Sequence, residues 1–310
     1  MKDTKVIVIL GPTASGKTGL GIKLAKALNG EIISGDSMQV YRGMDIGTAK
    51  PDDAEKEGIP HHLIDILDIT EKFSVAEFCS LALEAVEDIS SRGKTPIIVG
   101  GTGMYIETLV SGRLYETETA DEDKRREYEE YAREHGAEAL HAYLNELDPA
   151  SAEKIHPNNV KRVIRAIEIA VSGGKTKSCL EETLVSEKPF QSLMLYLTPP
   201  SREVMYERIN RRVDIMMETG LLDEVKRLDK QGLRETPTAS QAIGYKEFFP
   251  YIDGECSLEE SVEKLKQHTR NYAKRQTTYF GHMAELIPVP AGSESGVAAQ
   301  RICEEWLKTH

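Results

Sequence analysis

A phosphate-binding loop near the amino terminus carries the clearest chemical signature in the sequence. The pattern G-x-x-x-x-G-K-[ST] is matched at every defined position by Gly11, Pro12, Thr13, Ala14, Ser15, Gly16, Lys17 and Thr18. Glycines permit a tight turn whose backbone N–H groups point at phosphate oxygens, and a helix that starts there directs its positive end at the same anion. Lys17 adds a positive charge, and the Thr18 hydroxyl is suited to bind Mg²⁺. The loop therefore predicts a phosphate compound and Mg²⁺ as ligands, without identifying the compound.

Asp36 is the second residue with an evident chemical use. It follows an apolar stretch, residues 31–34, which we interpret as a strand ending at the same sheet edge as the phosphate loop. A carboxylate that faces a phosphate-bound electrophile is a natural general base. The same position also suits a helix N-cap or an outer ligand of Mg²⁺, and position alone does not separate these roles.

A second glycine-rich turn follows another apolar run, residues 96–99, and comprises Gly100, Gly101, Thr102 and Gly103. A nucleoside triphosphatase should carry an Asp at the end of this strand to organise Mg²⁺ and water. Glycines at this point suit the close approach of a ligand to the backbone, although chain reversal alone would also explain them.

The elements that must position these residues alternate between short apolar runs and helical patterns. Predicted buried strands cover 6–10, 31–34 and 96–99, and helical spacing covers 20–28 and 76–89. Such alternation indicates parallel strands joined by right-handed crossovers. The predicted fold class is therefore α/β, with a P-loop parallel sheet as its core and helices on both faces.

The composition changes after Gly112. Residues 116–138 hold ten acidic and four basic side chains, and the pattern stays helical through Val171. Strand character resumes at 193–197, before a second long helical stretch. We therefore predict a catalytic core from 1–112 and 193–310, interrupted by a helical insertion domain, 113–192.

Charge and composition exclude several classes of protein. The chain has 310 residues, 40% of them hydrophobic, and a net charge of −12, which excludes a globally basic nucleic-acid binder but not a local basic face. Its four cysteines are scattered without a CxxC pair, so neither a disulfide framework nor a zinc site is expected. No apolar run reaches the roughly 18 residues of a membrane span. We expect a cytoplasmic protein with no membrane partner, and a monomer.

Seven segments resemble the tRNA dimethylallyltransferase family, also called tRNA isopentenyltransferases, in its bacterial form. They are 11–18, 36–50, 61–65, 100–105, 148–149 with 158–168, 241–246 and 269–276. These segments follow the order of the family and span nearly the whole chain. The phosphate loop is shared with very many proteins, whereas the run 36–50 is highly specific.

The resemblance implies transfer of a dimethylallyl group from dimethylallyl diphosphate to the N6 amine of an adenine. That adenine lies beside the anticodon, at tRNA position 37. Asp36 matches the general base of the family, and the positions that hold the diphosphate are matched by Thr13, Lys17 and Thr18. The family has two arginines that close on the leaving group, and Arg208 and Arg212 resemble them. The positions of the family that contact tRNA are matched by Ser37, Met38, Gln39 and Thr102.

Basic clusters in two predicted helices are further candidates for RNA contact. One lies at 264–275 beside aromatic residues, and the other lies opposite the apolar face of 160–167. Basic and aromatic side chains suit phosphates and single-stranded bases, although a solvated helix face gives the same pattern. With the resemblance, we expect an anticodon stem-loop as partner, contacted by Arg125, Arg162, Arg165, Gln241, Lys274 and Arg275.

Three other functions remain possible from the residues. An isopentenyltransferase acting on free adenine nucleotides would have a similar sequence, and a P-loop phosphotransferase would bind ATP in the same loop. A nucleotide-gated RNA-binding protein would bind tRNA without any chemical product. The helical insertion and the late basic cluster favour a large RNA substrate over a free nucleotide.

Overall fold

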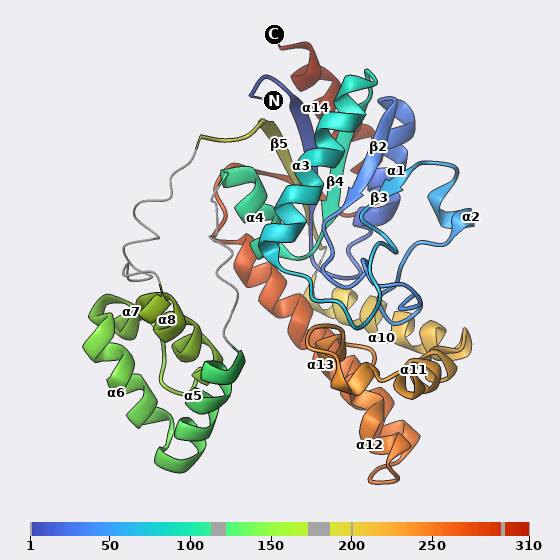
Figure 1. Cartoon of the computed structure of the whole chain (residues 1–310). Coiled ribbons are helices and arrows are strands. Elements are labelled where there is room, and N and C mark those ends of the chain that lie inside the picture. The colour runs from blue at the N-terminus through green and yellow to red at the C-terminus, as the bar shows by residue number, and fades with distance from the viewer. Residues whose placement is uncertain (1, 113–121, 173–186, 200, 293–294, 310) are drawn as a thin grey trace. The chain divides into compact units, whose positions relative to one another are not determined.

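The computed structural model describes residues 2–112, 122–172, 187–199, 201–292 and 295–309 (Figure 1). The chain divides into two compact units. The first comprises Met1–Ser111 with Lys188–His310, and the second comprises Gly112–Glu187.

Six strands of the first unit form one sheet in the order β3-β2-β4-β1-β5-β6. Every neighbouring pair is parallel. The strands are β1 (Lys5–Leu10), β2 (Gly30–Ser34), β3 (His61–His62), β4 (Thr95–Gly100), β5 (Gln191–Thr198) and β6 (Leu286–Pro290). The prediction of an α/β protein with a parallel sheet is confirmed.

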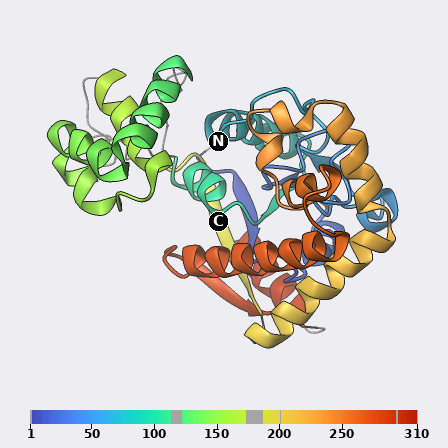
Figure 2. The same cartoon turned by 90° about the horizontal axis from the view of Figure 1, so that it is seen from below.

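Helices cover both faces of this sheet, and further helices lie beyond the carboxyl ends of its strands. Those beside the sheet are α1 (Lys17–Ala27), α2 (Asp53–Lys56), α3 (Val75–Ser91), α4 (Gly103–Ser111) and α14 (Ser295–Lys308). Beyond the carboxyl ends of the strands lie α10 (Arg202–Glu218), α11 (Leu221–Lys230), α12 (Phe249–Ile252) and α13 (Leu258–Phe280) (Figure 1). The view from below shows the yellow α10 against the orange-red α13 (Figure 2). Three short 3₁₀ helices connect them: η1 (Leu233–Glu235), η2 (Ala239–Gln241) and η3 (Lys246–Phe248).

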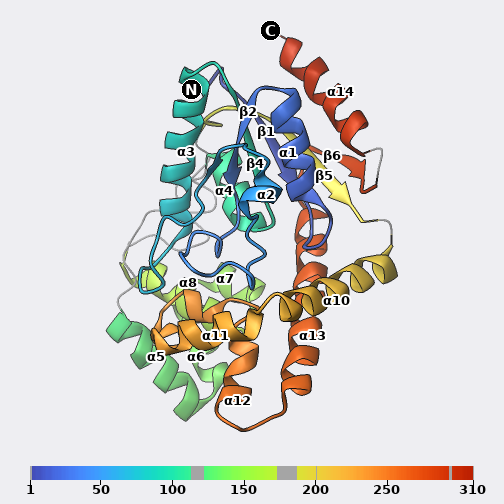
Figure 3. The same ribbon diagram turned by 90° about the vertical axis from the view of Figure 1, so that its right-hand side faces the viewer.

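Alternate residues of β1 supply two separate cores, which explains why residues 6–10 of this strand are all apolar. Val6 and Val8 pack with the buried residues of α3 and α4. Ile7 and Ile9 pack with those of α1 and α14. Figure 3 shows α3 on one side of the sheet and α1 with α14 on the other. Since strand side chains alternate between faces, a sheet covered on both sides needs uninterrupted hydrophobic strands.

The second unit is a small helical bundle with its own core. Its helices are α5 (Glu122–His135), α6 (Ala137–Leu147), α7 (Pro149–Lys154) and α8 (Val160–Ser172). Leu140 and Leu144 of α6 pack against Val163 and Ile167 of α8, and all four side chains are fully buried. The chain leaves this unit at Glu187, and β5 begins at Gln191, two residues before the strand expected at 193.

No helix in the described part of the chain has the length and apolar character needed to cross a membrane.

Candidate active site

A cavity of about 330 Å³ lies at the carboxyl edge of the sheet, where β1, β2 and β4 end. The phosphate loop and the segment after β2 form part of its wall, and α10, η2 and α13 form the rest. Of the residues predicted from the sequence, those lining it are Thr13, Lys17, Thr18, Asp36, Ser37, Met38, Gln39, Arg212, Gln241 and Arg275. Segments more than two hundred residues apart therefore meet in one place.

The phosphate loop has the strained backbone that its sequence requires. Ala14 (φ 61°) and Gly16 (φ 91°) both adopt left-handed conformations, and Gly16 is the N-cap of α1. The Ser15 N–H donates to the Pro12 carbonyl over 3.3 Å. The Ser15 hydroxyl is buried and has no hydrogen-bond partner within the described residues. The loop thus leads directly into the first turn of α1, whose free N–H groups and dipole attract an anion.

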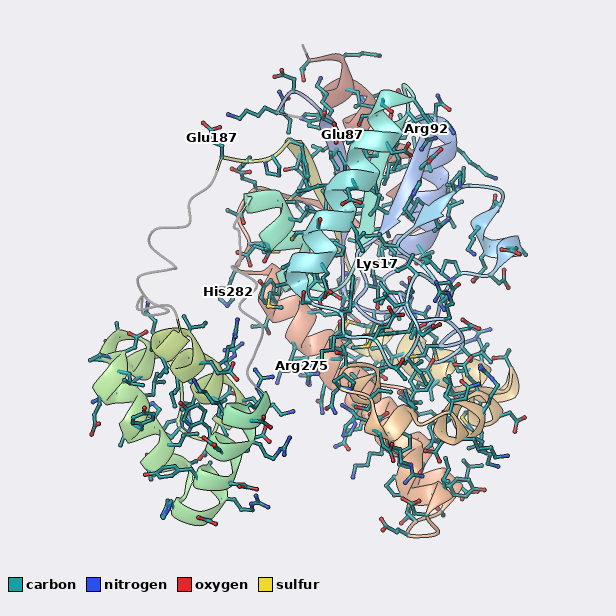
Figure 4. The ribbon with its side chains drawn as sticks, viewed as in Figure 1. Lys17, Glu87, Arg92, Glu187, Arg275 and His282 are labelled. Carbon is teal, nitrogen blue, oxygen red and sulfur yellow. The ribbon has the colours of Figure 1, made fainter. Side chains whose placement is uncertain are left out.

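Two cations face this anion site. Figure 4 shows Lys17 at the end of the sheet that faces α10–α13, and its ammonium donates to the Pro12 carbonyl over 3.3 Å. Burial and the nearby charge of Arg212 lower the pKa of Lys17 to about 8, against an opposing effect of Asp36. Burial also lowers the pKa of Arg212. Within the described residues Arg212 makes no hydrogen bond or ion pair, so the cavity holds positive charge that an anionic ligand would neutralise.

We expect the affinity for dimethylallyl diphosphate to fall above about pH 8. Lys17 is charged below its pKa of about 8 and becomes neutral above it, whereas the bound diphosphate requires the cation. Binding above this pH therefore takes up a proton, and the affinity should drop by up to about tenfold per pH unit. Calorimetric titrations from about pH 7 to pH 10 measure this directly. Lys17→Arg stays charged over the whole range and should show no such break. A wild-type affinity that does not change over this range would contradict the prediction.

Asp36 follows β2 and lines the cavity together with residues of α10 and α13. Its Oδ1 accepts the Met38 N–H over 2.9 Å and the Gln39 N–H over 3.4 Å, which fixes the carboxylate in an Asx turn. The carboxylate remains only half-buried, and it lines the same cavity as Lys17 and Thr18. This placement suits a general base whose geometry is set by the turn that follows it.

The glycine-rich turn after β4 packs directly against the segment that carries Asp36. A Cβ on Gly100 would lie 2.3 Å from the Gly35 carbonyl oxygen, so neither strand end could come this close with a side chain at Gly100. The Ser37 N–H donates to the Thr102 hydroxyl over 3.2 Å. The glycines therefore serve close packing of two strand ends, and Thr102 holds the residue next to Asp36.

A buried carboxylate on α11 anchors the rest of the specific segment after Asp36. Glu224 accepts N–H groups from Asp45, Ile46 and Gly47 at 3.2, 2.9 and 3.0 Å. It also accepts the Tyr245 hydroxyl at 2.7 Å. The segment needs this anchor because it has no regular secondary structure to satisfy its N–H groups.

Glu224→Ala should lower the free energy of unfolding by about 2–3 kcal/mol, because it leaves buried N–H groups without acceptors. The same change should weaken tRNA binding more than diphosphate binding, since the Thr48 and Ala49 carbonyls of the anchored segment accept hydrogen bonds from Gln39, a predicted tRNA contact. Chemical denaturation and separate binding titrations check both effects. Asp223→Asn, an exposed neighbour on α11, serves as control and should behave as wild type. Equal losses of the affinity for tRNA and of the affinity for the diphosphate would contradict a role of the anchored segment in tRNA binding.

Helix α13 supplies site residues whose roles the sequence did not indicate. Thr269 and Tyr272 line the cavity, and the Tyr272 hydroxyl interacts with Thr102 and Gln276. Burial and the negative charge of Asp36 raise the pKa of Tyr272, so the hydroxyl keeps its proton. The guanidinium of Arg275, labelled in Figure 4, lies 5.6 Å from the centre of the Tyr272 ring. Lys246, in the 241–246 segment, is a further lining residue that was not predicted.

Other predicted site residues lie outside this cavity. Arg208, on α10, lines a second, smaller cavity together with Ser15 and Gly16 of the phosphate loop. Lys274 is exposed on α13. In the helical unit, Arg125 and Arg165 both bind Glu168, at 2.8 and 3.2 Å. Arg162 is exposed on α8. The basic residues of this unit therefore include two that already have a carboxylate partner.

The residues present fit a magnesium ion that arrives with a phosphate ligand. In the described ranges no group of three or more His, Cys, Asp or Glu side chains could hold a metal alone. Mg²⁺ commonly keeps several waters and binds through one or two protein oxygens together with substrate phosphates. Thr18 and Asp36 offer such oxygens within the cavity.

Known proteins of similar sequence share one name. A tRNA dimethylallyltransferase of an Exiguobacterium species is 52% identical over 295 residues, which cover 95% of this chain and 93% of the relative. That of Bacillus subtilis is 50% identical over 288 residues, covering 92% and 91%.

Solved structures give the same result. A tRNA isopentenylpyrophosphate transferase from Bacillus halodurans is 44% identical, with a TM-score of 0.74 over 99% of this chain and 97% of that one. A eukaryotic dimethylallyltransferase acting on tRNA is 33% identical, with a TM-score of 0.84 over 99% and 80%. The family model described as IPP transferase matches residues 39–283. By sequence and fold, this chain belongs to the IPP transferase family.

Proposed function

We propose that this protein transfers a dimethylallyl group from dimethylallyl diphosphate to the N6 amine of adenine 37 in tRNA. The observation that carries the proposal is the cavity itself, in which the carboxylate of Asp36 and the cations Lys17 and Arg212 are close enough to interact. Relatives at about half identity over nearly their whole length are named tRNA dimethylallyltransferases, which supports the same reaction and a tRNA substrate.

The reaction needs few groups, and the cavity supplies them. The N6 lone pair forms a bond to C1 of the dimethylallyl group as the bond from C1 to the diphosphate oxygen breaks. The N6 proton passes to Asp36, and the electron pair of the broken bond leaves with the diphosphate. Lys17, Arg212 and the N–H groups at the start of α1 stabilise the negative charge that grows on this leaving group.

Mg²⁺ bound to the diphosphate would neutralise part of its charge, and Thr18 is the residue that would hold the ion. No water needs activation in this chemistry, which fits the glycine turn found where a nucleoside triphosphatase carries an Asp. The diphosphate leaves intact, so no nucleotide hydrolysis is required.

The remaining cavity wall suits the other substrate groups. Ile209, Val213 and Met216 of α10, with Ile243 and Leu265, give an apolar surface for the five-carbon chain. The adenine must leave its stack to reach Asp36, as base-modifying enzymes generally require. Arg275, which lines the cavity, and the exposed Lys274 next to it on α13 support contact with the RNA backbone. The setting we infer is the cytoplasm, where such a substrate is available.

Acceptor choice tests the proposal against its rivals. The purified protein with Mg²⁺ is incubated with labelled dimethylallyl diphosphate and either unmodified tRNA or a mixture of AMP, ADP and ATP. We expect label on tRNA alone. Label only on free nucleotides would indicate an isopentenyltransferase for adenine nucleotides. Hydrolysis of ATP or phosphate transfer without label on either acceptor would indicate a phosphotransferase, and tRNA binding without any product would indicate an RNA-binding protein.

A further inference from the structure

Gln276 of α13 joins the two halves of the cavity through its side-chain amide. Its Oε1 accepts the Thr13 N–H of the phosphate loop over 2.8 Å. Its Nε2 donates to the Gly101 carbonyl of the glycine-rich turn over 2.9 Å. The side chain is 94% buried, so it does not form part of the open cavity surface.

Only an amide can make this pair of contacts. Thr13 presents a donor and Gly101 presents an acceptor, and a glutamine is the one side chain of this length that both accepts and donates at its end. A carboxylate would face the Gly101 carbonyl with a second oxygen, and a thioether would leave both backbone groups unpaired. The orientation of the amide is also fixed by these partners, because a flipped amide would oppose donor to donor and acceptor to acceptor.

The chain leaves room for this contact at Gly101. A Cβ at that position would lie 2.4 Å from Gln276 Nε2, which is too close for two non-bonded heavy atoms. The backbone of Gly101 does not have the left-handed conformation that would require glycine. The glycine therefore serves to leave space for the Gln276 amide.

The network continues from Gln276 to the residue beside the general base. The Tyr272 hydroxyl interacts with both Gln276 and Thr102. Thr102 in turn accepts the Ser37 N–H over 3.2 Å, next to Asp36. An unbroken series of contacts thus runs from the phosphate loop, which holds the electrophile, to the segment that holds the base.

We infer that Gln276 is a positioning residue that sets the distance between the phosphate loop and the turn carrying Thr102, and so aligns C1 of the bound diphosphate ester with Asp36 and the target amine. This inference rests on the proposed function. Gln276 does not line the cavity, so its loss should slow the chemical step more than it weakens the binding of either substrate. A misplacement of about 1 Å between reacting groups can cost about 100-fold in rate.

The test measures single-turnover transfer from dimethylallyl diphosphate to saturating tRNA, with the dissociation constant of each substrate measured separately. Gln276→Met keeps length and removes both hydrogen bonds, and we expect a rate about 100-fold lower with each dissociation constant changed by less than about threefold. Gln276→Glu keeps only the acceptor for Thr13 when its carboxyl group is ionised, so this variant should also be slow and should slow further as the pH rises. Thr278→Ala, exposed on the same helix, is the matched control and should react at the wild-type rate.

Gly101→Ala provides a second variant that leaves Gln276 itself intact. The added methyl group displaces the amide, so this variant should also be slow, and the double variant Gly101→Ala with Gln276→Met should be no slower than the worse single one. A wild-type rate in a folded Gln276→Met protein would overturn the inference, as would a loss confined to substrate binding. If the wild-type protein itself transfers nothing to tRNA, the proposed function fails first, and the two failures are thereby distinguished.

Discussion

Asp36→Asn should lower the single-turnover rate of transfer to tRNA by about 100- to 10,000-fold, the range typical for loss of a general base. Asparagine keeps the Oδ1 acceptor for the Met38 N–H, so the turn after β2 should hold its shape. It cannot take the proton that N6 loses as the new bond forms. The affinities for tRNA and for dimethylallyl diphosphate should therefore stay near those of the wild type, and separate titrations measure them.

Asp68→Asn is the matched control for this variant, because Asp68 is an exposed carboxylate whose ion-pair partner is the surface residue Arg42. It should transfer the dimethylallyl group at the wild-type rate. Near-full activity in Asp36→Asn would show that another group takes the proton. A large loss of tRNA affinity would show that Asp36 acts in binding.

Arg212→Gln should lower the rate by about 100- to 1,000-fold, as for loss of one group that stabilises charge developing in a transition state. The guanidinium lines the same cavity as Asp36 and makes no hydrogen bond or ion pair within the described residues, so it is available to the diphosphate as the bond to C1 breaks. Because this charge grows during the reaction, the rate of the chemical step should fall more than the affinity for dimethylallyl diphosphate. Rapid-quench measurements with the substrate bound separate the two quantities.

Arg211→Gln is the natural control, since Arg211 is the exposed neighbour of Arg212 on α10 and does not line the cavity. It removes the same charge from the same helix and should leave the rate unchanged. Equal losses in both variants would mean that the overall charge of α10 matters, and the specific role of Arg212 would be wrong.

Features carried by local sequence were predicted well. The phosphate loop is a contiguous motif, and its glycine at 16 takes the left-handed conformation that the motif requires. Uninterrupted apolar runs such as 6–10 indicate strands buried on both faces, so β1 and the parallel sheet could be predicted. Asp36 could be placed at the correct sheet edge because parallel strands all end there.

Contacts between distant segments could not be predicted in the same way. Glu224 holds N–H groups 177 to 179 residues earlier in the chain, and Gln276 holds one 263 residues earlier. Neither residue stands out in its own helix, because the pairing depends on the tertiary fold. Whether a basic residue is free to contact RNA is equally hard to predict from the sequence. Arg125 carries the charge expected of an RNA contact, but its bond to Glu168, 43 residues later, is visible only in the structure.

The most direct test of tRNA prenylation is analysis of the nucleosides released from tRNA after incubation with the protein, dimethylallyl diphosphate and Mg²⁺. We expect mass spectrometry to find an adenosine carrying one added C₅H₈ group on N6, at position 37 alone, and in amounts equal to the diphosphate released. Asp36→Asn, assayed in parallel, should give almost none of it. Unmodified adenosine at position 37 after prolonged incubation with the wild-type protein would contradict the proposed function.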